Sequence, residues 1–360
     1  MRITIDATSM LVRSAGVKTY VWHWLGHLRR SAGDTEIRAF PFLDDLGRLD
    51  HESSALSTPA TIVRLALIKS MNEAGVPPLD WLLRGTDIFH ATNLLRRAPG
   101  RARLTATVHD MTCWLLPEVH TPGNIQADRE FAESILRRAD GLIAVSENTR
   151  QDAIRLLGLA PDRVHTIYSG IAETYYDATP TPRARPYVLY VGTIEPRKNL
   201  DTLLDAWALL KASHGGEFDL LIAGPVGWNS DKTLARIQRE AVYLGYVPES
   251  DLPGLTAGAT AFVYPSLYEG FGFPVAQAMA AGTAVLTSNN SCLPEIAADA
   301  ALLVDAKSPA EISSALALLL ESESLRSGLV ARGRTRAELF RWERCATESL
   351  HFFRSVCGSV

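Results

Sequence analysis

Short apolar, β-branched segments alternate with helical patterns along the whole 360-residue chain. A parallel strand that is buried on both faces reads as a continuous apolar run, and LTATVH and GLIAV are runs of this kind. Strands that alternate with helices imply a parallel sheet covered by helices. In the first half the expected strands are Arg2–Asp6, Ile37–Phe42, Asp87–His90, Leu104–His109, Gly141–Val145 and Val164–Tyr168. In the second half they are Tyr187–Val191, Asp219–Ala223, Ala241–Leu244, Ala261–Tyr264, Ala284–Thr287 and Ala301–Val304.

Helical patterns lie between several of these strands. The clearest begins after Ser146, a preferred N-cap residue, has the acidic Glu147 in its first turn, and ends at Gly158. The expected helices are Gly16–Arg30, Asn124–Arg138, Ser146–Leu157, Leu200–Lys211, Pro274–Ala281, Pro309–Glu321 and Ser324–Phe340.

A proline-rich segment separates the two halves. Residues 178–186 read ATPTPRARP, and their three prolines cannot continue a sheet. We therefore expect an α/β chain of two doubly wound, Rossmann-like domains, at residues 1–177 and 187–340, joined by this linker. Such sheets bind ligands at the carboxyl ends of their strands.

Composition narrows the class of protein further. Hydrophobic residues make up 47% of the chain and charged residues 21%, as in ordinary globular proteins. Lys and Arg number 36 against 40 Asp and Glu, and neither half has the basic excess of a nucleic-acid partner. No apolar stretch is long enough for a membrane span, and the MRITIDATSM start lacks the apolar core of a secretion signal. We therefore expect a cytoplasmic protein in which Cys113, Cys292, Cys345 and Cys357 are reduced thiols.

The segment Tyr264–Gly282, YPSLYEGFGFPVAQAMAAG, has the features of an anion-binding site. A strand runs into a loop with Gly270 and Gly272, and Pro274 then opens a helix. The glycines let the backbone approach a ligand closely, and the helix N-terminus presents free N–H groups and a partial positive charge. Glu269, just before the loop, is able to accept hydrogen bonds from hydroxyl groups. The simpler alternative is a plain strand-to-helix turn with a surface Glu.

A second strand–loop–helix segment, VGTIEPRKNL, places Arg197 and Lys198 just before a helix. Two cations at a helix N-terminus are repelled by the helix dipole, which is unfavourable unless an anion is present. Because both segments follow strands of the same domain, together they predict a diphosphate held by backbone amides and by these two charges. The alternative is a solvated basic pair.

The first half offers weaker signals. The strand end TVHDM carries His109 and Asp110, which could contact a substrate hydroxyl or a leaving group, although a histidine at a strand end is more often structural. The loop Arg13–Gly16 follows the first strand, and Gly16 could approach a phosphate.

Three further features favour structural explanations. His23 and His27 have metal-ligand spacing on an expected helix, but the aromatic residues around them favour packing. Tyr175, Tyr176 and Trp228 lack the basic stripe of a nucleic-acid stacking surface. A basic cluster is either a solvated face or a site of attraction to anionic lipid, and it consists of Arg96, Arg97, Arg101 and Arg103.

Four segments together resemble one family: VGTIEPRKNL, YEGFGFPVAQAMAAG, TVHDM and IAVSENTRQDAIRLLGLAPDRVHTIYSGI. They are similar to the retaining glycosyltransferases of the GT-B fold, family four, and more narrowly to bacterial mannosyltransferases of O-antigen and exopolysaccharide assembly. The resemblance covers nearly the whole chain. It implies two Rossmann-like domains that face each other across a cleft, with residues 341–360 as a terminal helix that packs back on the N-terminal domain.

The resemblance also implies roles for particular residues. Arg197 and Lys198 would hold the diphosphate of a nucleotide-sugar. Glu269 matches the first Glu of the Glu-x7-Glu motif, which contacts donor-sugar hydroxyls, and His109 matches a histidine beside the same sugar. The acceptor would lie on the N-terminal domain. The loop whose amides would hold phosphate and sugar is Gly270, Phe271 and Gly272.

Two positions depart from the family pattern. The second Glu of the motif is Gln277 here, so the ribose hydroxyls lose a carboxylate acceptor, at an expected cost of about 1 kcal/mol in donor binding. Thr193 stands where many relatives have Arg, so Arg197 would carry more of the phosphate charge.

The function that the resemblance implies is transfer of a hexose, with mannose favoured, from a nucleoside-diphosphate sugar to a glycan hydroxyl. GDP-mannose is the favoured donor, and the acceptor is a glycan or lipid-linked glycan, which would bring the protein into peripheral contact with the inner membrane. No Asp-x-Asp occurs, so we expect no metal ion and no other cofactor. The alternatives are a UDP-sugar-dependent transferase with another sugar, a nucleotide-sugar epimerase, and a non-catalytic protein that binds sugar nucleotides.

Overall fold

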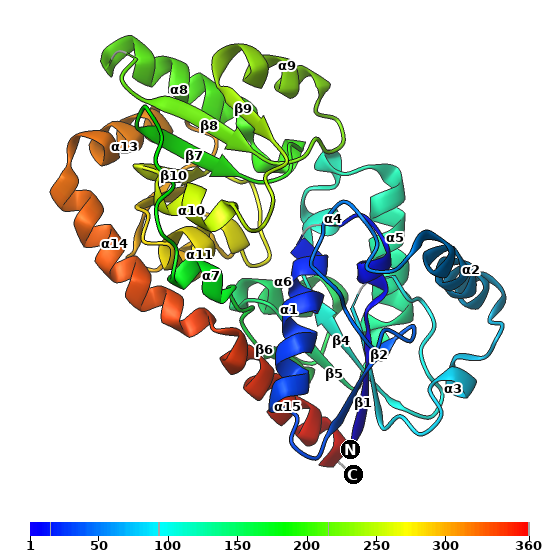
Figure 1. Cartoon of the computed structure of the whole chain (residues 1–360). Coiled ribbons are helices and arrows are strands. Elements are labelled where there is room, and N and C mark those ends of the chain that lie inside the picture. Colours follow the sequence, from blue (N-terminus) through cyan, green and yellow to red (C-terminus); the bar gives the residue numbers. More distant parts are fainter. Residues whose placement is uncertain (15, 93, 215, 359–360) are drawn as a thin grey trace. The chain divides into compact units, whose positions relative to one another are not determined.

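The computed structural model describes residues 1–14, 16–92, 94–214 and 216–358. The chain divides into two compact units: unit 1 comprises Met1–Gly170 and Arg341–Val360, and unit 2 comprises Ile171–Phe340. Each unit contains a six-stranded parallel sheet accompanied by helices (Figure 1). This confirms the predicted fold class of two Rossmann-like α/β domains.

Unit 1 begins with the strand β1 and contains the last helix of the chain, α15. Its strands are β1 Arg2–Asp6, β2 Glu36–Phe40, β3 Ile88–Ala91, β4 Arg103–Val108, β5 Gly141–Ala144 and β6 Val164–Thr166. Its helices are α1 Gly16–Ser31, α2 Thr58–Ala74, α3 Leu79–Leu82, α4 Thr112–Leu115, α5 Pro122–Ser134, α6 Glu147–Leu157 and α15 Trp342–Gly358. Short 3₁₀ turns lie at Thr8–Leu11, Pro117–Val119, Leu136–Arg138 and Pro161–Arg163.

Unit 2 repeats the alternation of strands and helices. Its strands are β7 Tyr187–Val191, β8 Asp219–Ala223, β9 Val242–Gly245, β10 Ala261–Tyr264, β11 Val285–Ser288 and β12 Ala301–Val304. Its helices are α7 Glu173–Tyr176, α8 Leu200–His214, α9 Asp231–Glu240, α10 Leu252–Ala257, α11 Phe273–Ala280, α12 Leu293–Ala297, α13 Pro309–Glu321 and α14 Glu323–Ala337. Its 3₁₀ turns lie at Pro196–Lys198 and Glu338–Phe340.

The strand order of unit 2 determines where a ligand site can form. The order is β12-β11-β10-β7-β8-β9, and all neighbouring strands run parallel. The first strand of the unit, β7, therefore lies beside the fourth, β10, with Ala261 opposite Val188. The direction of chain progression across the sheet reverses between these two strands, and open α/β sheets bind ligands at the carboxyl ends of such a pair.

Local sequence signals act as expected in helix α6. Its N-cap, Ser146, accepts a hydrogen bond from the backbone N–H of Thr149 at 3.1 Å. Its C-cap, Gly158, has a φ of 64°, in the left-handed region that glycine adopts at little cost. These two caps satisfy backbone groups that the helix itself leaves unpaired.

The boundary between the units differs from the predicted one. Unit 1 ends at Gly170 rather than at Asp177, because helix α7 belongs to unit 2. The Tyr176 hydroxyl at the end of α7 donates to the carbonyl oxygens of Ala337 at 2.8 Å and Phe340 at 3.0 Å. The helices that the sequence did not predict are α2, α3, α4, α7, α9, α10 and α12.

The terminal helix α15 is an integral part of unit 1 and packs on α1. The indole N–H of the buried Trp24 on α1 donates to the Ser349 hydroxyl on α15 at 3.0 Å. Trp342, at the start of α15, lies so close to Gly170 that a Cβ there would come within 2.4 Å of its indole ring. Among the helices that the structure describes, none combines the length and apolar character needed to cross a membrane.

Two glycines allow the chain segments after β7 and β8 to touch. Gly224 has a φ of 147°, and a Cβ built on it would lie 2.0 Å from the carbonyl oxygen of Gly192. Any side chain at Gly224 would therefore push the loop after β7 away from its position.

We expect Gly224→Ala to lower the free energy of unfolding by about 2 kcal/mol or more, since the methyl group clashes with backbone in a conformation that alanine disfavours. Gly216→Ala is the control, because a Cβ there meets no atom within 4 Å. Urea denaturation followed by circular dichroism measures both, and equal stabilities would contradict the close approach.

Candidate functional site

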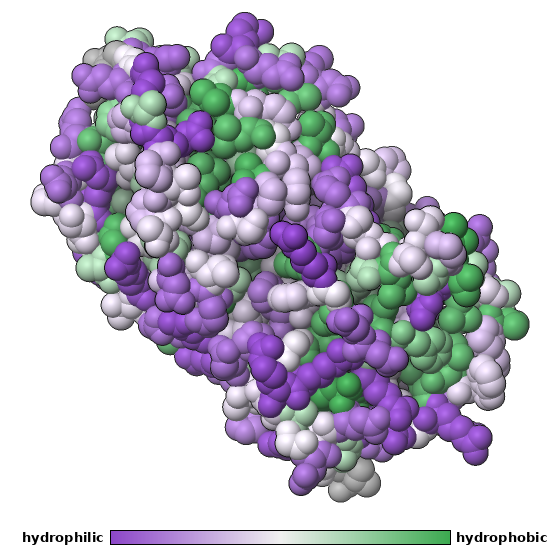
Figure 2. Space-filling model, viewed as in Figure 1, coloured by the Kyte–Doolittle hydropathy of each residue, from purple (hydrophilic) through white to green (hydrophobic). Residues whose placement is uncertain are grey.

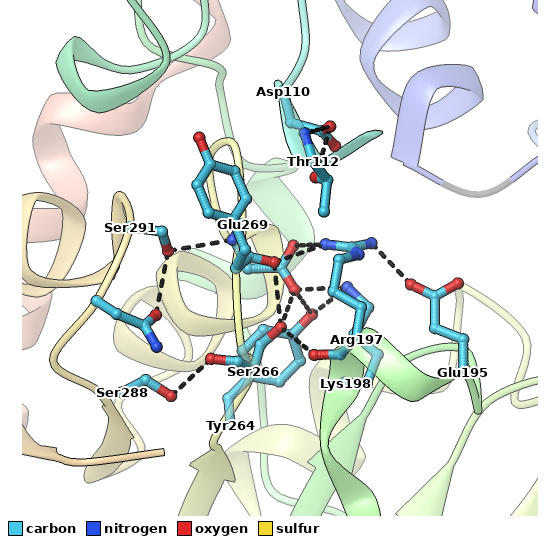
Figure 3. A network of polar contacts seen from close by, with 12 residues as sticks. Asp110, Thr112, Glu195, Arg197, Lys198, Tyr264, Ser266, Glu269, Ser288 and Ser291 are labelled. Carbon is cyan, nitrogen blue, oxygen red and sulfur yellow. Dashed lines mark hydrogen bonds and ion pairs between the residues drawn. The ribbon is translucent and has the colours of Figure 1, made fainter. Parts of the chain in front are cut away.

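The loops after β7 and β10 bring together the charged residues that the sequence singled out (Figure 3). Arg197 and Lys198 lie in the 3₁₀ turn that follows β7, and Glu269 lies in the loop that follows β10. Because β7 and β10 are neighbours, both loops leave the same edge of the sheet at the point where the strand order reverses.

Glu269 is the centre of this cluster. Its Oε1 accepts from the Lys198 ammonium at 2.6 Å, the Ser266 hydroxyl at 2.7 Å and the Tyr264 hydroxyl at 3.0 Å. Its Oε2 pairs with Nη1 of Arg197 at 2.9 Å. The residue is 7% exposed, so these contacts replace most of the hydration of its carboxylate.

The charges of the cluster set the ionisation of Glu269. Burial alone would raise the pKa of this carboxyl group, but the charges of Arg197 and Lys198 outweigh burial and hold the pKa at about 2. Arg197 also pairs with Glu195 through Nη2 at 2.8 Å, and Lys198 donates to the Tyr264 hydroxyl at 2.7 Å. Two cations therefore face two carboxylates, and the cluster is electrically balanced.

This balance corrects one step of the sequence argument. We expected Arg197 and Lys198 to require an anionic ligand, because the helix dipole repels them. Glu269 and Glu195 of the chain itself supply that negative charge. The two cations therefore hold Glu269 in place, and a diphosphate would have to share them with it.

The glycine loop leads directly into helix α11, which begins at Phe273, one residue before the predicted Pro274. Gly272 is the N-cap of α11 with a φ of 81°, and a Cβ on it would lie 2.8 Å from Leu293. The side chain of Phe271 is buried and contacts the rings of Phe273 and Phe340, with centroids 5.1 Å and 5.4 Å apart. Any contribution of Phe271 to phosphate binding is therefore limited to its backbone.

The two positions that depart from the family pattern lie on the same edge of unit 2. Gln277 is half-buried on α11, and its side chain has no hydrogen bond to another described residue. Thr193 is half-buried in the segment after β7 and packs against Gly227, where a Cβ would come within 2.8 Å of its methyl group. Neither side chain replaces a charge of the cluster.

Four residues of the cluster were not identified from the sequence. Tyr264 and Ser266 complete the hydrogen bonds of Glu269, and Glu195 completes those of Arg197. The buried hydroxyl of Tyr190, whose ring stacks on Tyr264 at 5.6 Å, has no hydrogen-bond partner among the described residues. The polar residues at strand ends in YPSLYE were the available signal for Tyr264 and Ser266.

His109 follows β4 in unit 1, as predicted. Its Nε2 is buried and has no hydrogen-bond partner in the described part of the chain. The ring of Tyr20 packs edge-on against the imidazole, with centroids 5.0 Å apart. Burial lowers the pKa of His109 to about 4, against a smaller opposing effect of Asp110, so the imidazole is neutral at pH 7. Gly16 begins α1 with open space around its Cα, and Ala15 before it lies outside the described residues.

The two histidines that have metal-ligand spacing in the sequence contact other side chains of unit 1. His23 stacks on Trp342 with centroids 5.5 Å apart, and His27 pairs with Glu343 at 3.0 Å. Among the described residues no group of three or more potential ligands is placed to hold a metal ion.

The basic cluster of unit 1 is also largely committed to internal contacts. Arg96 pairs with Glu130, and Arg103 pairs with Asp140 at 3.1 Å. Arg97 donates to the carbonyl of Met71 at 3.1 Å, near the end of α2. Structural roles therefore account for three of its four members.

Similarity to known proteins now identifies the family. The family model described as Glycosyltransferase Family 4 matches residues 15–175, and the model described as Glycosyl transferases group 1 matches residues 173–336. O-antigen chain mannosyltransferase B of Escherichia coli is 34% identical over 292 residues, which cover 76% of this chain and 76% of that protein. The chain belongs to glycosyltransferase family 4. Serotype-specific mannosyltransferase WbdA of Escherichia coli is 27% identical over 252 residues, which cover 64% of this chain and only 31% of WbdA.

Solved structures agree with a GT-B fold for this family 4 chain. Sucrose-phosphate synthase of Thermosynechococcus elongatus has a TM-score of 0.75 and 19% identity, and the match covers 100% of both chains. WaaG, a glycosyltransferase involved in lipopolysaccharide biosynthesis, has a TM-score of 0.70 and 13% identity, with 98% of this chain covered and 99% of WaaG.

The ionisation of Glu269 predicts how the family 4 chain responds to acid. A carboxyl group whose folded pKa is about 2, below its ordinary 4.5, contributes stability above pH 4.5 that is lost as the pH falls toward 2. We expect Glu269→Gln to remove this component, so that its free energy of unfolding changes less between these pH values than that of the unaltered protein. The exposed Glu217→Gln is the control, and urea denaturation across the pH range measures all three. A Glu269→Gln variant with an unaltered pH slope would contradict the ion cluster.

Proposed function

We propose that this family 4 protein is a retaining hexosyltransferase that moves mannose from GDP-mannose to a glycan hydroxyl, on a lipid-linked polysaccharide precursor. Family membership supports transfer of a sugar. The names of the relatives O-antigen chain mannosyltransferase B and WbdA support mannose as the sugar and an O-antigen-type acceptor. GDP-mannose as donor follows from the resemblance to mannosyltransferases rather than from any residue that reads the base.

The observation that carries the proposal is the Glu269 cluster at the carboxyl ends of β7 and β10. It places Arg197, Lys198 and a glycine loop at the one edge of unit 2 where the strand order predicts a ligand. A purely structural ion cluster would have no need of a helix N-terminus and a left-handed glycine beside it.

The reaction requires stabilisation of a leaving diphosphate. The bond from the anomeric carbon to the phosphate oxygen breaks, a bond to the acceptor oxygen forms on the same face, and the acceptor proton passes to the departing phosphate. Arg197, Lys198 and the backbone amides from Gly270 to Gly272 stabilise the charge that develops on the diphosphate. We expect them to do so without a metal ion, since the sequence has no Asp-x-Asp motif to bind one.

The ionisation of Glu269 and of His109 bears separately on the role that the family resemblance gives to each. With a pKa of about 2, Glu269 is ionised throughout the physiological range and accepts hydrogen bonds from donor-sugar hydroxyls through Oε2, which has fewer partners than Oε1. His109 is neutral, so its Nε2 exchanges a hydrogen bond with a sugar hydroxyl rather than contributing a positive charge.

A thermal-shift panel with GDP, UDP, ADP and CDP and their sugar conjugates, with and without EDTA, tests the donor. A ligand at 100 times its Kd adds about 2.7 kcal/mol of stability, which for this chain length is a shift of several degrees. We expect GDP and GDP-mannose alone to give that shift, with no loss in EDTA. A shift with UDP and its sugar conjugates alone would identify a UDP-sugar, rather than GDP-mannose, as the donor. No shift with any nucleotide would favour a protein without transferase activity.

Turnover with an added acceptor tests the chemistry. Lys198→Ala is expected to lower kcat by about 100-fold or more, as for other groups that stabilise developing charge. Lys211→Ala, an exposed change on α8, is the control and should keep full activity. Product formed without acceptor would indicate an epimerase, and full activity of Lys198→Ala would remove this residue from the site.

A further inference from the structure

The hydroxyl group of Tyr190 is a buried hydrogen-bond donor beside the Glu269 cluster. Tyr190 is 0% exposed, and its hydroxyl has no hydrogen-bond partner among the described residues. Hydrophilic side chains cover much of the surface of unit 2 (Figure 2), where water satisfies their polar atoms. Most buried side-chain polar atoms have a partner, because an unpaired one costs free energy that a phenylalanine ring would not. We therefore expect this hydroxyl to gain a partner in another state of the protein.

The hydroxyl lies at the carboxyl end of β7, where the candidate site begins. A Cβ built on Gly192, the residue after β7, would come within 2.8 Å of the Tyr190 oxygen. The ring of Tyr190 stacks on that of Tyr264, with centroids 5.6 Å apart and an interplanar angle of 20°. The hydroxyl of Tyr264 is already paired, with Lys198 at 2.7 Å and Glu269 at 3.0 Å. Two stacked tyrosines therefore differ in whether their hydroxyl groups have a partner.

Charged side chains of the cluster surround the Tyr190 hydroxyl. Burial raises its pKa well above the ordinary 10, and the negative charges of Glu269 and Glu195 raise the pKa further. Arg197 opposes them with a smaller effect. The hydroxyl is therefore protonated at physiological pH, and the charged groups around it include two carboxylates that can accept its hydrogen.

Glu195 is the carboxylate with capacity for another hydrogen bond. Its side chain is 3% exposed, and its Oε1 pairs with Nη2 of Arg197 at 2.8 Å (Figure 3). Among the described residues, Arg197 is the only side chain that pairs with this carboxylate. Glu269, in contrast, accepts from three side chains at Oε1 and pairs with Arg197 at Oε2. A new donor is therefore accommodated more easily at Glu195.

A diphosphate at this edge of the sheet competes for Arg197. The guanidinium group holds Glu195 through Nη2 and Glu269 through Nη1. If it turns toward a phosphate oxygen, it weakens its pairing with a carboxylate. Glu269 keeps its three partners at Oε1, whereas Glu195 would become a buried charge without a partner, which is strongly unfavourable. Binding of a diphosphate is thus favoured by any group that replaces Arg197 at Glu195.

We propose that Tyr190 is a positioning residue for the donor diphosphate, whose hydroxyl donates to Glu195 when Arg197 turns to the phosphate. This role rests on the proposed function, because it requires that unit 2 binds a nucleoside diphosphate. In the free protein, Arg197 neutralises Glu195 and the hydroxyl is unpaired. In the complex, the hydroxyl stabilises Glu195 and Arg197 stabilises the phosphate. Tyr190 thus favours binding of the diphosphate without touching it.

Tyr190→Phe removes only the hydroxyl and tests this role. Isothermal titration calorimetry of the full chain with GDP, UDP, ADP and CDP in turn measures the Kd. We expect the nucleotide that binds the unaltered protein to bind Tyr190→Phe about tenfold or more weakly, as for loss of a hydrogen bond to a charged group. The Tm of the ligand-free variant should be equal to that of the unaltered protein or higher, because the hydroxyl has no partner there to lose.

Tyr187→Phe is the matched control on the same strand. The Tyr187 hydroxyl donates to the carbonyl of Leu255 at 2.7 Å, so it is paired in the free protein. This variant should lose about 2 °C or more in Tm and bind the nucleotide with an unaltered Kd. Equal affinity of Tyr190→Phe and the unaltered protein would overturn the role of Tyr190. A loss of Tm in ligand-free Tyr190→Phe as large as in Tyr187→Phe would also overturn it, since the hydroxyl would then be paired before the donor binds.

A double-mutant cycle tests the connection between Tyr190 and Glu195. Glu195→Gln removes the charge that needs a new partner, so adding Tyr190→Phe to it should weaken nucleotide binding by less than about twofold. Losses of affinity that multiply would show that the two residues act independently, and would overturn the proposal. Failure of the proposed function gives a different result, in which the unaltered protein binds none of the four nucleotides. That result would overturn both, because no diphosphate would then compete for Arg197.

Discussion

A single buried carboxylate joins the two loops on which the candidate site depends. Glu269 and Lys198 stand 71 positions apart in the chain and are 2.6 Å apart in the structure. Burial of Glu269 without cations would carry a large desolvation penalty, and burial of the cations without Glu269 would do the same. Each loop therefore stabilises the position of the other. The strand order supplies the proximity, since β7 and β10 are neighbours only because the sheet reverses between them.

The position of that edge could be predicted from the sequence because it depends on short-range signals. Apolar runs marked β7 and β10 with the bounds that the structure has, and glycine and basic residues marked the loops that follow them. The pairing between the loops could not be predicted, since nothing in VGTIEPRKNL indicates that Glu269 neutralises its cations. The sequence argument placed both loops at the carboxyl ends of strands of one domain, but it did not anticipate that carboxylates of the chain itself neutralise the two cations.

Helix α2 could not be predicted because its sequence lacks the usual amphipathic pattern. Helix prediction from pattern relies on one apolar and one polar face, and TPATIVRLALIKSMNEA has apolar residues on both sides. The helices α10 and α12 were missed for another reason, because both are short and contain Pro, which reads as loop. That reason does not apply to α9, which has ten residues and neither Pro nor Gly. The boundary at Asp177 followed the prolines, whereas the Tyr176 hydroxyl attaches the preceding helix to unit 2.

The membership of α15 in unit 1 has a consequence for biosynthesis. The ribosome makes Met1–Gly170 first, then all of unit 2, and only then the helix whose Ser349 and Trp342 pack against Trp24 and Gly170. Unit 2 is a continuous segment and has its whole sequence available earlier. Unit 1 is complete only when α15, which follows unit 2 in the sequence, has been made. Throughout the synthesis of unit 2, the nascent polypeptide therefore exposes the apolar side of α1 that α15 later covers. The unit made first is thus the last to be completed.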